Sequence, residues 1–124
     1  MGKRVLIVDD EPNILISLEF LMKREGYEVQ VARDGEEGLA LAGSWCPHVV
    51  LLDVMMPRKS GFDVCQAIRA DTALAGMCIV MLTAKGRDTD VAKGLALGAD
   101  AYLTKPFSTQ ELVRRVRELL GAQG

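Results

Sequence analysis

The sequence contains little cysteine, and it has no long apolar run. Its three cysteines, Cys46, Cys65 and Cys78, are odd in number and show no CxxC spacing. This pattern argues against a disulfide framework and against a zinc site, so we expect reduced thiols in the core or at its boundary. No stretch reaches the ~20 apolar residues of a transmembrane helix, and no signal-peptide pattern opens the chain. The sequence therefore predicts a cytoplasmic protein that does not enter a membrane.

An excess of charge of one sign is also missing. The formal net charge is −2 at pH 7, so the whole chain lacks the electrostatic character of a nucleic-acid-binding protein. The single histidine, His48, follows Pro47 in a loop before a predicted strand, where we expect it to be solvated. Internal repeats, low-complexity segments and linkers are absent. The 124 residues predict one domain spanning residues 1–124.

Short apolar runs alternate with amphipathic patterns along the chain. The runs lie near positions 5, 29, 49, 78 and 101, and continuous apolar runs suit strands of a parallel sheet buried on both faces. Helix-start signals stand near Pro12, Asp34, Ser60, Asp88 and Ser108. Five strands alternating with five helices indicate an α/β fold with a doubly wound sheet.

The apolar spacing also predicts which side of each helix faces the sheet. The expected inward residues are Ile14, Leu18, Leu21 and Met22 in the first helix, Phe62, Cys65 and Ile68 in the third, Val91 and Leu95 in the fourth, and Leu112, Val113, Val116, Leu119 and Leu120 in the last. The second helix is expected to run from Asp34 to about Ala42. Ile16 and Phe20 form an apolar pair on the outer side of the first helix.

Polar side chains follow four of the predicted strands. Asp9 and Asp10 come after the first, Asp53 ends the third, and Thr83 and Lys105 end the fourth and fifth. The carboxyl ends of parallel strands meet at one edge, where such sheets bind ligands. Three carboxylates in one pocket repel strongly and call for a divalent cation such as Mg²⁺. This set suits a carboxylate that accepts a phosphoryl group, with a hydroxyl and an ammonium for its oxygens.

Four motifs in this order resemble the receiver domain of two-component response regulators. They are residues 8–11 (VDDE), 52–57 (LDVMMP), 82–84 (LTA) and 98–107 (GADAYLTKPF), and the resemblance covers essentially the whole chain. It implies a flavodoxin-like sheet of strand order 2-1-3-4-5 with five helices on both faces. It also implies a signalling domain that catalyses only its own phosphorylation and dephosphorylation, rather than an enzyme acting on a separate substrate.

The same resemblance implies a role for each matching residue. Asp53 would take a phosphoryl group from a phosphohistidine on a sensor histidine kinase or a phosphotransfer protein. Asp10, Asp53 and the main-chain carbonyl of Met55 would hold Mg²⁺, with Asp9 binding directly or through water. Lys105 would pair with the phosphoryl group.

The resemblance further implies a switch and two contact surfaces. Thr83 would move toward the phosphoryl group and Tyr102 would fill the space it leaves. Met55 and Lys85 would flank the pocket and tune the access of water. The Lys105–Pro106 peptide bond is expected to be cis. The kinase is expected to dock at Ile16, Phe20, Pro106 and Phe107, and a partner or output domain at the fourth helix, fifth strand and fifth helix.

Three alternatives remain open at this point. A phosphatase of the haloacid dehalogenase type uses similar residues, but carries two carboxylates in one DxDx pattern on its first strand. A flavodoxin-type module would bind a flavin phosphate, yet the first strand-to-helix loop here is acidic and would repel it. A receiver could also work as a docking module without phosphorylation, which the complete acidic set disfavours.

Overall fold

The computed structural model describes residues 2–84 and 87–122. Within these residues, five strands alternate with five helices, as predicted. The strands are β1 (Arg4–Val8), β2 (Glu28–Ala32), β3 (Val49–Asp53), β4 (Cys78–Ala84) and β5 (Ala101–Lys105), and the helices are α1 (Pro12–Arg24), α2 (Gly35–Trp45), α3 (Gly61–Ala70), α4 (Asp88–Ala96) and α5 (Thr109–Ala122). No helix in the described ranges is both long and apolar enough to cross a membrane.

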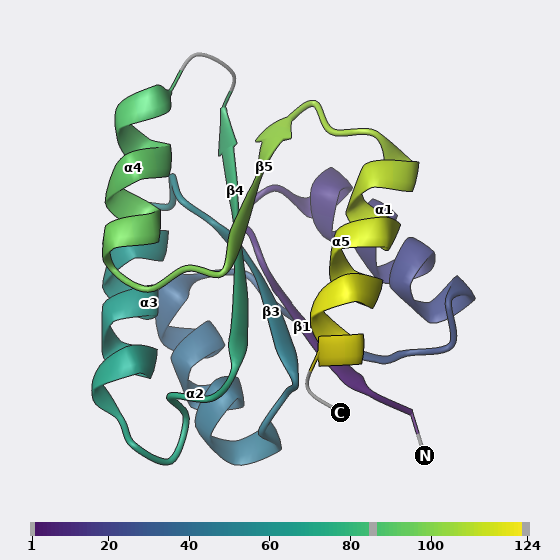
Figure 1. The fold of residues 1–124 in the computed structure, drawn as a ribbon, viewed down its shortest axis with the longest axis horizontal. Coiled ribbons are helices and arrows are strands. Elements are labelled where there is room, and N and C mark those ends of the chain that lie inside the picture. Colours follow the sequence, from purple (N-terminus) through teal and green to yellow (C-terminus); the bar gives the residue numbers. More distant parts are fainter. Residues whose placement is uncertain (1, 85–86, 123–124) are drawn as a thin grey trace.

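The strands form one parallel sheet in the order β2-β1-β3-β4-β5, which confirms the predicted flavodoxin-like topology. α1 and α5 cover one face of the sheet, and α2, α3 and α4 cover the other (Figure 1). The chain passes from β1 to β2 on one side and then crosses to β3 on the other. The polar residues that follow β1 and β3 therefore lie at the point where the direction of winding reverses, which is where such sheets bind ligands.

The core consists of two apolar layers, one on each face of the sheet. In β1, Val5 and Ile7 pack toward α1 and α5, while Leu6 and Val8 pack toward the opposite face. Every residue of β3 is buried, as a central parallel strand requires. β2 differs from the prediction, because Glu28 and Gln30 are exposed. This strand lies at the sheet edge, where water reaches one side.

Helix packing departs from the sequence prediction mainly in α4. Leu95 was predicted to face inward, but 45% of its surface is exposed. Gly94 is the buried residue of this helix instead, and it faces Met81 and Phe62. In α3, Cys65 and Ile68 are buried as predicted. Val64 is buried with them, whereas Phe62 is only half-buried. α4 therefore turns the side that carries Gly94 toward the sheet, which the spacing of its apolar residues did not predict.

Two further expectations about the amino-terminal edge of the sheet were wrong. α2 continues to Trp45 rather than ending near Ala42. His48 is half-buried rather than solvated, and its Nδ1 accepts a hydrogen bond of 3.0 Å from the backbone N–H of Arg4. Burial, together with the positive charges of Lys3 and Arg4, lowers the pKa of His48. This histidine therefore helps to fix the start of β1 against β3.

Candidate functional site

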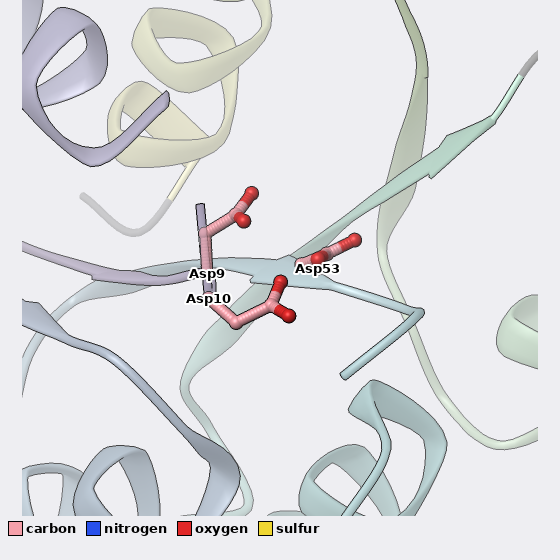
Figure 2. Close-up of side chains that lie close together, drawn as sticks. All are labelled: Asp9, Asp10 and Asp53. Carbon is pink, nitrogen blue, oxygen red and sulfur yellow. The ribbon is translucent and has the colours of Figure 1, made fainter. Parts of the chain in front are cut away.

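Three carboxylates lie together at the carboxyl edge of the two central strands. Asp9 and Asp10 follow β1, and Asp53 is the last residue of β3. One oxygen from each lies within 4.8 Å of the others, and Figure 2 shows the three side chains facing a common space. Asp9 is fully buried and Asp53 is 4% exposed, whereas Asp10 is exposed. The cluster is therefore a buried anionic pocket that opens to solvent on the side of Asp10.

Lys105, at the end of β5, supplies the positive charge in this pocket. Its Nζ lies 3.0 Å from Asp9 Oδ2 and 3.4 Å from Asp53 Oδ1. Glu11 Oε1 lies 3.6 Å from the same nitrogen. Burial opposes the charge of the lysine, but the hydrogen bond to Asp9 and the charges of Asp53, Asp9 and Glu11 outweigh it and raise the pKa of Lys105. The ammonium is thus charged at neutral pH.

Asp53 is the carboxyl whose ionisation the site most strongly opposes. Burial and then the negative charge of Asp9 raise the pKa of Asp53 to about 7. The charge of Lys105 and a hydrogen bond of 3.3 Å from the backbone N–H of Met55 act in the opposite direction without cancelling it. One lysine therefore does not neutralise the cluster, and a further cation would favour the ionised form of Asp53.

Thr83 is the fourth polar residue at this edge. Its side chain is buried, and its Oγ1 has no hydrogen-bond partner among the described residues. β4 pairs with β3, with Asp53 opposite Leu82, so Thr83 lies one residue beyond the register of Asp53 on the neighbouring strand. A buried hydroxyl without a partner is destabilising by about 1–3 kcal/mol. An orphaned donor beside an anionic pocket is suited to an incoming oxygen ligand.

The backbone around Asp53 is held by a close contact that the sequence analysis did not identify. A side chain at Gly61 would overlap the carbonyl group of Asp53 and the Cα atom of Val54. The N–H of Gly61 donates to the carbonyl of Val54 at 3.0 Å, and the N–H of Val54 donates to that of Leu82 at 3.0 Å. The start of α3 therefore fixes the end of β3. A glycine directly after the cap residue Ser60 was the available signal.

The donor set fits Mg²⁺. All three clustered side chains offer carboxylate oxygens, and Mg²⁺ prefers a few such ligands together with waters and phosphate oxygens. Met55 lies two residues after Asp53, 58% exposed, beside the open side of the pocket. Glu11, which the sequence analysis also did not single out, contacts Lys105 and donates its backbone N–H to Asp9 Oδ1 at 2.9 Å. Lys85 lies outside the described residues.

Tyr102 and the residues predicted for docking lie on β5, in the loop after β5 and on α1. Tyr102 on β5 is 41% exposed and lines a cavity of about 440 Å³ together with Pro106 and Phe107. The Lys105–Pro106 peptide is cis, as expected. Ile16 and Phe20 are 65% and 66% exposed on the outer side of α1. Pro106 is exposed, and Phe107 is half-buried against the core layer of α1 and α5.

Comparison with known proteins identifies the family. Residues 5–117 match the model of the response regulator receiver domain. The chain belongs to this family. Family membership excludes the haloacid dehalogenase and flavodoxin alternatives, which the acidic first loop and the position of Asp53 already disfavoured. The protein is therefore the receiver domain of a two-component response regulator.

Solved receiver structures agree with this assignment over almost the entire chain. A protein of Chloroflexus aurantiacus assigned as a response regulator is 36% identical, with a TM-score of 0.94 over 98% of this chain and 99% of its own. The chemotaxis protein CheY4 of Vibrio cholerae is 33% identical, with a TM-score of 0.90 over 96% and 99%. The DrrB receiver domain, solved in a BeF3-activated form, is 34% identical, with a TM-score of 0.86 over 98% and 99%.

Proposed function

We propose that this receiver domain, residues 1–124, accepts a phosphoryl group on Asp53 from a phosphohistidine of a sensor histidine kinase or a phosphotransfer protein. The observation that carries the proposal is the position of Asp53. It is a nearly buried carboxylate at the end of a central strand, 3.4 Å from the Lys105 ammonium and within 4.8 Å of two other carboxylates. Such a site stabilises charge by position, which is what phosphoryl transfer requires.

In the transfer step, an oxygen of the ionised Asp53 carboxylate attacks the phosphorus of the donor. The O–P bond of an acyl phosphate forms as the P–N bond breaks, and the electron pair of that bond stays on the leaving imidazole. Lys105 already contacts Asp53, so its ammonium can donate to a phosphoryl oxygen as charge develops. The orphaned hydroxyl of Thr83 supplies a donor for another oxygen.

Asp10, Asp53 and the main-chain carbonyl of Met55 would hold Mg²⁺, with Asp9 binding directly or through water. When bound, the ion supplies the positive charge that Lys105 alone does not provide. Asp9 already accepts hydrogen bonds from Lys105 at 3.0 Å and from the N–H of Glu11 at 2.9 Å. These contacts support a role for Asp9 in which it orients the lysine as much as it binds the metal.

The proposed switch couples Thr83 to Tyr102. A phosphoryl oxygen would satisfy the Thr83 hydroxyl, and a charge-assisted hydrogen bond of this kind contributes about 1.5–3 kcal/mol. That is enough to shift a two-state equilibrium roughly tenfold or more. Tyr102 stands on the neighbouring strand with 41% of its surface exposed, so its side chain has room to change orientation. The surface of α4, β5 and α5 would present the change to a partner or output domain.

Partners and location complete the proposal. The kinase or phosphotransfer protein would dock at the exposed pair Ile16 and Phe20, and at Pro106 and Phe107. The chain would bind neither nucleic acid nor a membrane directly, and would catalyse only its own phosphorylation and dephosphorylation. A cytoplasmic location is supported by Cys46 and Cys65, which form no disulfide bond, as expected in a reducing compartment.

The test is to incubate the protein with acetyl phosphate, with and without Mg²⁺, and to measure its intact mass. We expect one added phosphoryl group that depends on Mg²⁺ in the wild type and none in Asp53→Asn. Asp71→Asn is the matched control, because Asp71 is an exposed aspartate at the carboxyl end of α3. Equal labelling of Asp53→Asn, or no labelling of the wild type, would exclude Asp53 as the phosphoacceptor.

A further inference from the structure

α4 buries few of its own residues, and its middle contacts α3 through Lys93, whose Nζ lies 4.6 Å from the centre of the Phe62 ring. Gly94 is its fully buried residue, whereas α1 and α3 each bury four. Even a Cβ atom at Gly94 would meet Met81 at 3.4 Å, an ordinary contact distance. At the amino end of the helix, Arg87 pairs with Asp90 of the same helix at 2.7 Å. This ion pair holds the first turn of α4 to its own N-cap residue rather than to the sheet.

The carboxyl end of α4 is held very differently, by the side chain of Arg69 from α3. Its Nε donates to the carbonyl of Gly98 at 2.8 Å, and its Nη2 pairs with Asp100 Oδ2 at 2.8 Å. Its Nη1 donates to the carbonyls of Ala75, at 2.8 Å, and Met77. One guanidinium thus joins the end of α3, the segment before β4 and the turn that connects α4 to β5.

Asp100 extends this junction into the sheet. Its Oδ2 accepts the backbone N–H of Ile79 at 2.8 Å, and its own N–H donates to the carbonyl of Ile79 at 2.8 Å. Gly98 has φ +110°, and a Cβ there would approach the Arg69 side chain to 3.0 Å. The turn is therefore shaped to receive the guanidinium. We call Arg69, Gly98, Asp100 and Ile79 the Arg69 junction.

We infer that the Arg69 junction is the fixed point about which α4 moves when the site is occupied. This inference rests on the proposed function. α4 begins four residues after Ala84, at the site edge, and ends at the junction on the opposite edge. A displacement near Thr83 would then be converted into rotation of the helix about its anchored end. The amino end of α4, which begins at Asp88 and lies farthest from the junction, would be displaced most. Arg69 is in this view a positioning residue for the output face.

The location of the junction separates it from the chemistry. Ile79 and Thr83 are four residues apart on β4, which corresponds to about 13 Å along a strand. This exceeds the ~8 Å screening length at physiological salt. Removing the Arg69 charge should therefore leave phosphorylation unchanged and alter only the response of α4.

The experiment measures backbone amide exchange of the full chain, with and without beryllofluoride and Mg²⁺, for wild type, Arg69→Met and Arg69→Lys. Arg33→Met is the matched control, because Arg33 is an exposed arginine. At rest, Arg69→Met should speed exchange at residues 94–99 by about tenfold and leave α1 unchanged, the effect of losing at least one charge-assisted hydrogen bond. With beryllofluoride and Mg²⁺, the change in amide exchange of Arg69→Met at residues 90–93 should fall to less than about one third of the wild-type change. The beryllofluoride concentration for half-saturation should stay within about twofold of wild type. Arg69→Lys should show the same faster exchange and the same reduced response, because a lysine ammonium cannot reproduce the planar set of N–H donors of the guanidinium.

The inference would be overturned if resting Arg69→Met exchanged like the wild type at residues 94–99, or if it kept the full beryllofluoride response at residues 90–93. If beryllofluoride does not change amide exchange in the wild type, the proposed function is refuted instead. The comparison of wild type and Arg69→Met without beryllofluoride still tests the role of the junction. Should Arg69→Met fail to fold, Asp100→Asn takes its place. Its amide oxygen can still accept the N–H of Ile79, but the ionic contact with Arg69 is lost, and the same two measurements apply.

Discussion

Replacing Asp53 with asparagine should stabilise the metal-free protein. The carboxyl is 4% exposed and faces Asp9 across the pocket, which raises the pKa of Asp53 from 3.8 to about 7. At about 1.4 kcal/mol per pKa unit, ionising it at alkaline pH opposes folding by up to ~4 kcal/mol. Asparagine removes this charge but pairs imperfectly with Lys105, which offsets roughly half of the gain. We therefore expect a net stabilisation of about 2 kcal/mol, or roughly 8 °C in Tm.

The pH dependence has a definite sign. Because the pKa of Asp53 is raised in the folded state, that state binds more protons than the unfolded chain between pH 3.8 and about 7. The stability of the metal-free wild type should therefore fall as pH rises through this window. The difference from Asp53→Asn should be largest above pH 7 and small near pH 5, where the folded-state carboxyl is already protonated.

Urea unfolding in EDTA at pH 5 and pH 8, for wild type, Asp53→Asn and the control Asp71→Asn, measures both effects. Adding Mg²⁺ at pH 8 should stabilise the wild type more than Asp53→Asn, which has lost a ligand. The reasoning is refuted if Asp53→Asn is no more stable than wild type at pH 8 without metal. It is also refuted if its advantage is the same at both pH values.

Three further substitutions test other parts of the site. Gly61→Ala should destabilise the fold by about 1–3 kcal/mol through overpacking, because the new Cβ overlaps the carbonyl of Asp53; Gly43→Ala, which has open space, should not, and urea unfolding compares them. Thr83→Ala should leave the resting stability within about 1 kcal/mol of wild type and still accept a phosphoryl group, but should abolish the exchange response of α4; a retained response contradicts the switch. Phe20→Glu should slow transfer from the cognate kinase by roughly tenfold, ~1.4 kcal/mol, and leave labelling by acetyl phosphate unchanged; an unaltered kinase rate removes Phe20 from the docking surface.

Much of the fold could be predicted from the sequence because its signals are local. The continuous apolar run of β3 can be satisfied only by a strand covered on both faces. Asp34 and Ser60 were correctly placed at helix starts, since each accepts a backbone N–H three residues later. The burial of Leu95 was predicted wrongly, because α4 turns Gly94 rather than Leu95 toward Met81 of the sheet.

The convergence of the site was predictable for a topological reason. Parallel strands present their carboxyl ends at one edge, so residues far apart in the sequence, such as Asp9 and Lys105, had to lie near one another. Their order of contact was not predictable. The structure places the Lys105 ammonium against Asp9 at 3.0 Å and Asp53 at 3.4 Å, and Glu11 joins it at 3.6 Å. Such distances depend on how all the strands twist and pack.

The sequence by itself determined the alternation of strands and helices, the edge of the sheet that carries the acids, and the family whose motifs those acids complete. These follow from side-chain periodicity and chain direction, which are properties of short segments. Only the tertiary structure decided that Asp53 is buried deeply enough to resist ionisation and that the Thr83 hydroxyl has no hydrogen-bond partner among the described residues. It also decided that Arg69 binds the turn after α4. Burial, hydrogen-bond satisfaction and anchoring depend on contacts between distant segments, and these exist only once the chain has packed.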